Sequence, residues 1–229
     1  MFHWLNYQEI LAGKDETNIH QTASIIFRRS SLSNLRVLEV RENLLKILPD
    51  SLVQLTKLES LDIGSNVIEQ LPNHIGYLQN LKELWLDSNE LLQLPNDLGQ
   101  LKRLQCLDVS ENKLSHLPDE IGDLESLTNF ELSSNHIEQL PTSIGQLSQR
   151  LLILKVNSNS LTKLCEEIGH CTALTELILT ENTLTELPKT IGNLIHLTNL
   201  NIDRNQLTHL PVEVRFFFST ICLFDQSLF

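Results

Sequence analysis

The sequence predicts an α/β solenoid of about eight repeats of 23 residues, with a parallel β-sheet along one side. Three residue types that keep one period predict this fold. All seven prolines keep it: Pro49, Pro72, Pro95, Pro118, Pro141, Pro188 and Pro211. One unit has Cys165 at the proline position, and one unit is a residue longer. Six of the eight glycines keep it as well: Gly76, Gly99, Gly122, Gly145, Gly169 and Gly192. So does one asparagine in every unit: Asn43, Asn66, Asn89, Asn112, Asn135, Asn159, Asn182 and Asn205.

The repeating unit reads L-x-x-L-x-[LVI]-x-x-N-x-[LI]-x-x-L-P-x-x-[IL]-G-x-L-x-x, which is the pattern of a leucine-rich repeat. Its eight copies begin at Leu35, Leu58, Leu81, Leu104, Leu127, Leu151, Leu174 and Leu197. In the third copy, Leu84 and Leu86 alternate with polar residues, which indicates a short strand with these two side chains in the core. We therefore expect a curved horseshoe with the parallel sheet on its concave face and short helical or irregular turns on its convex face.

The remaining fixed residues shape the coil. We expect Asn89 to turn the chain after the strand and to hydrogen-bond backbone groups of adjacent coils. Each of these backbone groups would cost about 1–3 kcal/mol if it were buried without a partner. Pro95 fixes φ at the end of the inner turn, and Gly99 permits a tight backbone on the convex side. Because no coil can bury its own leucines, stability depends on stacking between neighbouring coils.

Two segments depart from the repeat and set the expected domain boundaries. Residues 1–34 contain no clean unit, residues 35–214 form the repeat domain, and residues 215–229 form an apolar tail. Five of the eight phenylalanines lie in the last 14 residues, where a solenoid should instead end in a polar coil. Three interpretations of the tail stay open: an alternative end of the gene product, a hydrophobic plug over the last coil, and a docking motif.

The composition disfavours several classes of function. A net charge of −12 argues against binding nucleic acid or an anionic membrane surface, because both need clustered Lys and Arg. No apolar run reaches the roughly 18 residues of a membrane span, and the N-terminus lacks the features of a signal peptide. The four cysteines have no paired spacing, so neither a disulfide framework nor a zinc site is indicated. We expect a cytoplasmic protein whose contact with membranes is indirect.

No pattern typical of a catalytic, cofactor or metal site occurs. Among the eight histidines, His116 and His209 share a repeat position, but they lie four coils apart. Cys106 falls on the strand side without a fixed histidine neighbour, so we interpret it as a plain thiol. Cys171 takes the place of a core leucine and is expected to be buried. The sequence predicts no enzyme activity, no cofactor and no small-molecule substrate.

The informative surface is formed by the third, fifth, seventh and eighth residues of each unit, which we call the strand face and which a horseshoe would make concave. Of its 32 positions, eleven are acidic and three are basic, a net charge of −8, whereas 18 of the other 197 residues are acidic. Stacked carboxylates ~5 Å apart repel by roughly 1 kcal/mol per pair even in water. A neutral polar face would be as soluble without that repulsion, so the acidity favours a binding role.

One column of this face singles out a tryptophan. The fifth positions of successive units place Trp85 between Asp62 and Asp108. An exposed indole among acids suits Lys and Arg side chains of a partner, although local stacking for stability is the alternative. The predicted protein-binding residues are Trp85, Glu83, Asp87, Asp62, Asp108, Glu111, Glu131, Glu39, Lys155, Glu181 and Asp203. A protein partner with a basic surface is expected.

The stretch from Glu83 to Pro118, with the later segments LKVNSN, IGHC, LTELILTENTLTELP and LTNLNIDRNQL, resembles the LAP family of cytoplasmic leucine-rich-repeat scaffolds, which includes Scribble, Lano, Erbin and Densin. The resemblance covers about Leu35 to Val214 and extends to strand-face positions that the repeat leaves free, such as Trp85 and Lys155. It implies a polarity scaffold at basolateral membranes, junctions or synapses that recruits partners such as Lgl proteins. The sequence carries no PDZ domain, and its first cysteine is Cys106, so the family's peptide binding and N-terminal acylation are not implied.

A second interpretation keeps signalling and changes the partner. Ras-pathway scaffolds built from 23-residue repeats bind a small GTPase and a phosphatase subunit, and this chain fits that type as well. The third interpretation is a repeat module attached to a catalytic domain, but the residues outside the repeats are too few for a separate catalytic core.

Overall fold

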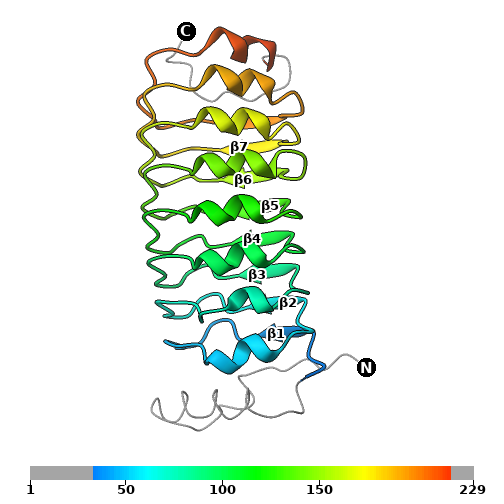
Figure 1. The fold of residues 1–229 in the computed structure, drawn as a ribbon. Helices are drawn as coiled ribbons and strands as arrows, with labels where there is room; N and C mark the ends of the chain where they lie inside the picture. The colour runs from blue at the N-terminus through cyan, green and yellow to red at the C-terminus, as the bar shows by residue number, and fades with distance from the viewer. Residues whose placement is uncertain (1–32, 218–229) are drawn as a thin grey trace.

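The computed structural model describes residues 33–217 as a stack of coils (Figure 1). Eight three-residue strands pair in chain order into one open, all-parallel sheet. They are β1 (Val37–Glu39), β2 (Ser60–Asp62), β3 (Glu83–Trp85), β4 (Cys106–Asp108), β5 (Asn129–Glu131), β6 (Ile153–Lys155), β7 (Glu176–Ile178) and β8 (Asn199–Asn201). The predicted leucine-rich-repeat solenoid is confirmed.

A row of short 3-10 helices lies opposite the sheet, one in each coil (Figure 1). They are η2 (Asp50–Gln54), η3 (Ile75–Tyr77), η4 (Asn96–Gln100), η5 (Asp119–Asp123), η6 (Thr142–Leu147), η7 (Glu166–His170), η8 (Lys189–Asn193) and η9 (Val212–Phe217). Neighbouring helices approach closely at the repeated glycine: a Cβ on Gly99 would lie 2.4 Å from the Glu120 carbonyl oxygen. Glycine is therefore required where these backbones touch.

Strand register follows the repeat step. Glu83 of β3 pairs with Ser60 of β2 and Cys106 of β4, so equivalent residues form straight columns across the sheet. The unit with one extra residue keeps this register, since Asn129 still pairs with Ile153. The insertion is absorbed beside η6, which is six residues long and is followed by a helical turn at Ser148.

The core is a single column of leucines and isoleucines between the sheet and the 3-10 helices. In the third unit, Leu81, Leu84, Leu86 and Leu91 are all at most 1 % exposed. Phe130 and Cys171 fill leucine positions in later coils and are also fully buried. The expectation that Cys171 is a core residue is confirmed, and its Sγ lies 3.2 Å from the Ile144 carbonyl oxygen.

A ladder of asparagine side chains joins consecutive coils. The Asn112 amide nitrogen donates to the carbonyl oxygens of Val109 and Ser110 in its own coil and of Leu86 in the preceding coil, at 3.0–3.1 Å. Its Oδ1 accepts a hydrogen bond from the Leu91 backbone N–H at 2.9 Å. The same four bonds recur at Asn66, Asn89, Asn135, Asn159, Asn182 and Asn205. The expected role of the repeat asparagine is confirmed.

The residue before each asparagine has a left-handed backbone. Its φ lies between 51° and 57° in all eight units, at Glu42, Ser65, Ser88, Glu111, Ser134, Ser158, Glu181 and Arg204. This turn aims the backbone N–H at the next coil, as when the Ser88 N–H donates to the Ser110 carbonyl oxygen at 2.9 Å. The side chains of these residues consequently sit at the edge of the strand face.

One coil departs from the proline pattern without changing shape. Cys165, before η7, has φ −69° and ψ 149°, close to the −69° and 150° of Pro118 before η5. Packing of the flanking coils therefore fixes this extended conformation even where no proline ring does.

The expected end segments fall largely outside the described residues. The predicted irregular segment 1–34 overlaps the description only at its last two residues, and most of the predicted tail 215–229 lies beyond it. The helix η9 runs through the expected boundary at Val214 as far as Phe217. Within residues 33–217, no helix is long and apolar enough to cross a membrane.

The ladder predicts a graded effect of asparagine substitution. We expect Asn112→Ala to lower the free energy of unfolding by about 3 kcal/mol, because it leaves several buried backbone groups unpaired. Asn43→Ala is the matched control, since among residues 33–217 the Asn43 side chain bonds only Val40 and Arg41 in its own coil, and its loss should cost about 1 kcal/mol. Urea unfolding followed by circular dichroism measures both, and equal losses would contradict the inter-coil role of Asn112.

Candidate functional site

The strand face is built from two parts of each coil. The strands supply the third and fifth residues, which alternate with a buried leucine or phenylalanine, as Glu83 and Trp85 flank Leu84. The turn after each strand supplies the seventh and eighth residues. The register of the sheet then aligns each of the first two positions into a column along the stack.

Trp85 stands in the fifth-position column, in register with Asp62 of β2 and Asp108 of β4. The indole is partly exposed, on a strand held by its neighbours on both sides. An aromatic side chain with acidic neighbours in a rigid sheet offers a flat apolar surface in a negative environment, which is the arrangement that attracts a cationic side chain.

Arg41 forms an ion pair that the sequence pattern did not reveal. Its guanidinium reaches across a whole coil to both carboxylate oxygens of Asp87, with Nη1 2.8 Å from Oδ1, and Nη1 also lies 3.3 Å from Asp62 Oδ1. The bidentate hydrogen bonds to Asp87 raise the pKa of Arg41 further above its ordinary value. Gly64 opens this path, because a Cβ there would lie 2.2 Å from Arg41 Nη1.

The other two basic residues of the face are also paired internally. Lys155 Nζ donates to Glu131 Oε1 at 2.9 Å, and this bond raises the pKa of Lys155. Arg204 pairs with Glu181. All three cations of the strand face thus contact carboxylates of the same face, and the excess of eight negative charges has no basic counterpart on it.

Serines tether two of the predicted acidic residues. Ser60 Oγ donates to Glu83 Oε2 at 3.0 Å, and Ser88 Oγ donates to Glu111 Oε2 at 2.8 Å. Each serine belongs to the coil before its glutamate, so the carboxylates are oriented while remaining exposed. Glu83 and Glu111 flank Trp85 from the third-position and eighth-position columns.

Two of the predicted contact residues are mostly buried. Asp87 is 9 % exposed and Asp108 is 8 % exposed. Asp87 binds Arg41, and Asp108 Oδ1 accepts hydrogen bonds from the backbone N–H and the hydroxyl of Ser110. These two carboxylates therefore contribute charge to the face from below its surface, whereas Glu83 and Glu111 are exposed and Trp85 is partly exposed.

The remaining predicted residues spread along the stack. Asp62 and Glu131 lie one and two strands from Trp85, and Lys155 lies on β6. Glu39 lies at the first strand and is exposed. Glu181 and Asp203 belong to the last two coils, four and five strand spacings or roughly 20 Å from Trp85. The prediction therefore describes one extended surface with its aromatic residue near one end.

Cys106 lies on this face beside the acids. Burial, and after it the negative charges of Asp108, Glu131 and Glu83, together raise the pKa of its thiol from 9.0 to about 11. A thiol with this pKa stays protonated at neutral pH and is a poor nucleophile. The interpretation of Cys106 as a plain thiol agrees with this environment.

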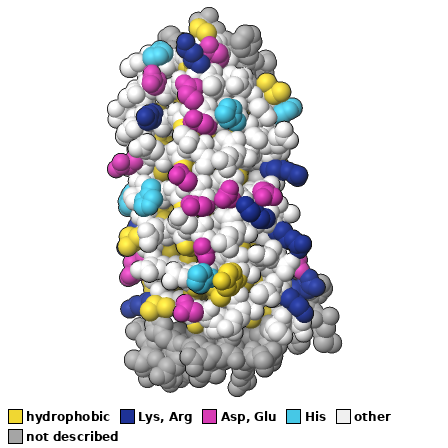
Figure 2. Space-filling view, in the orientation of Figure 1, with side chains coloured by type: hydrophobic (Ala, Val, Ile, Leu, Met, Phe, Trp, Pro, Cys, Tyr) yellow, Lys and Arg dark blue, Asp and Glu magenta, His cyan; other side chains and the backbone are white. Residues whose placement is uncertain are grey.

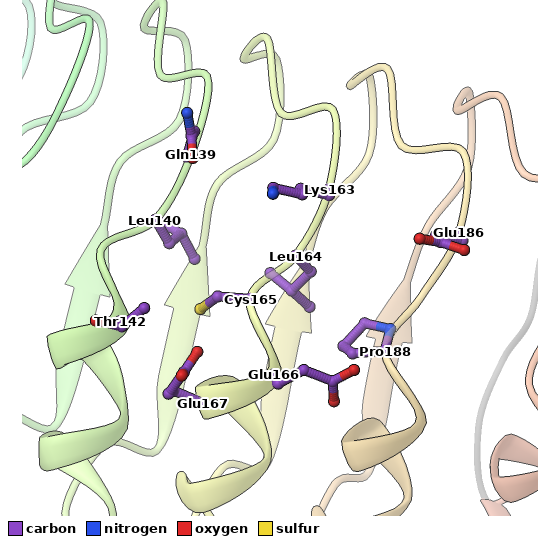
Figure 3. A pocket seen from close by; sticks show the side chains of 10 residues that line it. All are labelled: Gln139, Leu140, Thr142, Lys163, Leu164, Cys165, Glu166, Glu167, Glu186 and Pro188. Carbon is purple, nitrogen blue, oxygen red and sulfur yellow. The ribbon is translucent and has the colours of Figure 1, made fainter.

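Away from the strand face, a hollow of about 350 Å³ lies before η6, η7 and η8 (Figure 3). Leu140, Leu164 and Pro188 form its apolar wall, and Cys165 and Lys163 also line it. Burial raises the pKa of the Cys165 thiol, so this cysteine is not activated either. Among residues 33–217, no three His, Cys, Asp or Glu side chains group in a way that could hold a metal ion.

The raised pKa of Cys106 predicts slow alkylation. At neutral pH we expect iodoacetamide to modify it ~100-fold more slowly than the same thiol in an unstructured peptide, because two pKa units remove that much thiolate. The rate should rise about tenfold per pH unit and level off only above a pH of about 11. Peptide-resolved mass spectrometry measures the rates, and fast modification at pH 7 would refute this environment.

We expect removal of the Asp108 charge to stabilise the folded protein by an amount that depends on pH. Burial raises the pKa of this carboxyl, so the folded state holds the proton more tightly than the unfolded chain does. The resulting loss of stability is complete at neutral pH and disappears as the pH falls below the ordinary carboxyl pKa. Asp108→Asn should therefore stabilise the protein at pH 7 and lose this advantage at acidic pH in urea titrations. A variant equally stabilised at both pH values would contradict the assignment.

Comparison with family models supports the repeat assignment. A leucine-rich repeat region model matches residues 95–182, and two further leucine-rich repeat models match residues 16–68 and 80–101. The second match begins 19 residues before the first clean repeat at Leu35. No curated protein matches the chain.

Several solved structures share the fold. A leucine-rich-repeat protein of Leptospira interrogans is 35 % identical with a TM-score of 0.72, and the match covers 88 % of this chain and 56 % of that one. The plant peptide hormone receptor RGFR1 in complex with RGF2 is 30 % identical with a TM-score of 0.73, covering 84 % of this chain and 36 % of the receptor. The ectodomain of the Arabidopsis thaliana receptor kinase GASSHO1/SCHENGEN3, in complex with CASPARIAN STRIP INTEGRITY FACTOR 2, is 30 % identical with a TM-score of 0.66, covering 83 % and 27 %.

The chain thus spans about half the length of the bacterial protein and about a third of the plant receptors. The strand order, the inter-coil asparagines and the matching family models all indicate leucine-rich repeats. Residues 33–217 therefore have the fold of a leucine-rich-repeat solenoid.

Proposed function

We propose that this chain is a non-enzymatic protein-interaction module that binds a basic protein surface on its strand face. The observation that carries the proposal is the charge balance of that face. Eleven carboxylates share it with three cations, each of which already contacts a carboxylate there. A partner that supplies Lys and Arg would neutralise the remaining charge.

The surplus charge determines how such a partner approaches. A surface of one sign draws an oppositely charged protein toward it and raises the association rate, and added salt weakens this effect. Internal pairs such as Arg41 with Asp87 keep the carboxylates fixed before the partner arrives. Pre-oriented charges lose less conformational entropy on binding than free side chains do.

Trp85 supplies the apolar centre of the proposed interface. Tryptophan and tyrosine carry a large share of the binding energy in protein interfaces, above all where they lie near the centre of the contact. With Glu83 and Glu111 exposed on either side, the indole would receive an arginine or lysine whose charged end reaches the two glutamates.

The known structures favour a peptide or protein ligand over other classes. Two of the similar plant receptors are described as complexes with the peptide hormone RGF2 and with CASPARIAN STRIP INTEGRITY FACTOR 2. These relatives use the same type of fold for recognition.

The resemblance of strand-face residues such as Trp85 and Lys155 to the LAP family supports a narrower proposal. The module would then belong to a polarity scaffold in the cytoplasm, recruited to basolateral membranes or junctions, and would bind an Lgl-like protein. The Ras-pathway type of scaffold differs from it in requiring a nucleotide-dependent GTPase partner.

Binding assays on strand-face variants test the interface. We expect Trp85→Ala to weaken binding of a purified Lgl-family protein about thirtyfold, since an interface tryptophan contributes ~2 kcal/mol. The double variant Glu83→Lys with Glu111→Lys should weaken it at least as much, because it reverses two exposed charges beside the indole. These positions are preferable to Asp62 and Asp108, whose carboxylates also hold Arg41 and Ser110.

The matched control reverses two exposed glutamates outside the strand face, Glu69→Lys with Glu138→Lys. It changes the net charge equally and should leave affinity nearly unchanged, with circular dichroism reporting the fold of every variant. Loss of binding in the control as well would reject a localised interface. A GTP-loaded Ras-type GTPase, assayed in parallel, would replace the Lgl-like partner if it alone binds.

A further inference from the structure

A second charged surface lies at the edge of the sheet where the chain passes from the 3-10 helices into the strands. Arg36 and Lys57 of the first unit and Lys82 and Arg103 of the third border one groove of about 320 Å³. Among residues 33–217, Glu59 is the single carboxylate in the lining, so these residues give the groove a net charge of +3 in a chain whose net charge is −12. We call these residues the basic flank, and Lys and Arg side chains gather along the lower right edge in Figure 2.

The repeat register builds this flank as two interleaved columns. The second position of each unit gives Arg36, Glu59 and Lys82 in order, and the last position gives Lys57, Asn80 and Arg103. Glu59 lies between Arg36 and Lys82 and pairs with both, with Lys82 Nζ 2.7 Å from Glu59 Oε2. One carboxylate is thus shared by two cations.

Within the part of the chain that the structure describes, the other two cations contact only neutral groups. Lys57 Nζ donates to Asn34 Oδ1 at 2.6 Å, and Arg103 Nη1 donates to Asn80 Oδ1 at 2.7 Å. Arg103 therefore uses one of its five N–H donors, and both side chains are exposed. Their bonds to amide oxygens orient the charges without neutralising them.

The spacing of the cations fits an extended peptide. Like positions two coils apart are ~9.6 Å apart at a strand spacing of ~4.8 Å, and three residues of an extended chain span ~10 Å. An extended segment in the polyproline II conformation, which has three residues per turn, turns side chains i and i+3 to the same side ~9.3 Å apart. Running along the stack, such a segment would bring carboxylates at positions i and i+3 opposite Lys57 and Arg103. Nucleic acid is disfavoured because only four cations lie here and the strand face close by carries a net charge of −8.

We propose that the basic flank binds an acidic, extended peptide segment of a partner protein, with Lys57 and Arg103 as the principal contacts. The site is separate from the strand face and has the opposite charge. The module then offers two surfaces, one for a basic partner and one for an acidic segment, which suits a scaffold that holds two ligands together.

Fluorescence anisotropy with a labelled synthetic peptide tests this proposal. The probe carries glutamate at every third position with serine and glycine between, and a second probe of equal composition has its glutamates in one block. We expect the full chain to bind the first probe at low salt and to release it as salt is added. The first probe should bind more tightly than the second, and equal affinities would overturn the proposed register.

Charge reversals locate the site. Lys57→Glu with Arg103→Glu should weaken peptide binding at least ~10-fold, since the reversed charges repel the probe. Lys163→Glu with Lys189→Glu makes the same change in net charge at exposed lysines outside the flank and should have little effect. An equal loss in both double variants, or no measurable binding by the unaltered chain, would overturn the proposal.

Two further measurements exclude other occupants. We expect no self-association of the unaltered chain in sedimentation velocity. Self-association that the Lys57→Glu with Arg103→Glu variant abolishes would mean that a second copy of the chain occupies the flank, and would overturn the proposal. A single-stranded oligonucleotide should not displace the probe, and displacement would point to a general polyanion site. Because the probe is acidic, these outcomes are independent of whether the strand face binds its own partner.

Discussion

The hydrogen bonds of the repeat asparagine set how the coils stack. From Asn66 to Asn205, each amide nitrogen joins carbonyl groups of two coils, and each Oδ1 receives a backbone N–H of the preceding coil, as Asn112 does with Leu86 and Leu91. These bonds satisfy buried polar groups and also fix how far one coil is rotated relative to the next. The register of every surface column, acidic or basic, follows from this constraint.

Fixed register has an electrostatic consequence that the sequence pattern alone does not settle. Columns of like charge repel, and the protein relieves the repulsion on the strand face with bonds that cross coils: Arg41 to Asp87, Lys155 to Glu131, and serines to Glu83 and Glu111. On the basic flank Glu59 has the same role between Arg36 and Lys82. In both places, a charged residue that occurs in one repeat contacts a defined residue one or two coils away, because the register is fixed.

The repeat length, the strands, the core leucines and the asparagine ladder could all be predicted from the sequence, because each depends on residues of fixed type at fixed spacing. The contacts of individual side chains could not. Arg41 reaches Asp87 because Gly64 lacks a Cβ, and a pattern that leaves the seventh position free gives no signal of this.

Burial was the other part of the site that the pattern left undetermined. Asp108 shares a column with exposed or half-buried residues, yet Ser110 and its neighbours cover it. The repeat pattern did not predict the basic flank either. Its cations are divided between two positions of the repeat, and the composition of the whole chain is acidic. Periodicity predicts which residues share a surface, whereas exposure and pairing depend on the particular neighbours in each coil.

In-register stacking places the Trp85 indole at the surface among carboxylates. Collisional quenching of its fluorescence measures this exposure and charge in a Trp4→Phe variant that leaves Trp85 as the only indole. With the effect of each ion scaled to its quenching of free tryptophan, we expect caesium to quench Trp85 more strongly than iodide does, and the difference to shrink as inert salt screens the carboxylates. Scaled quenching by iodide that equals or exceeds quenching by caesium, or an indole that neither ion reaches, would contradict this placement.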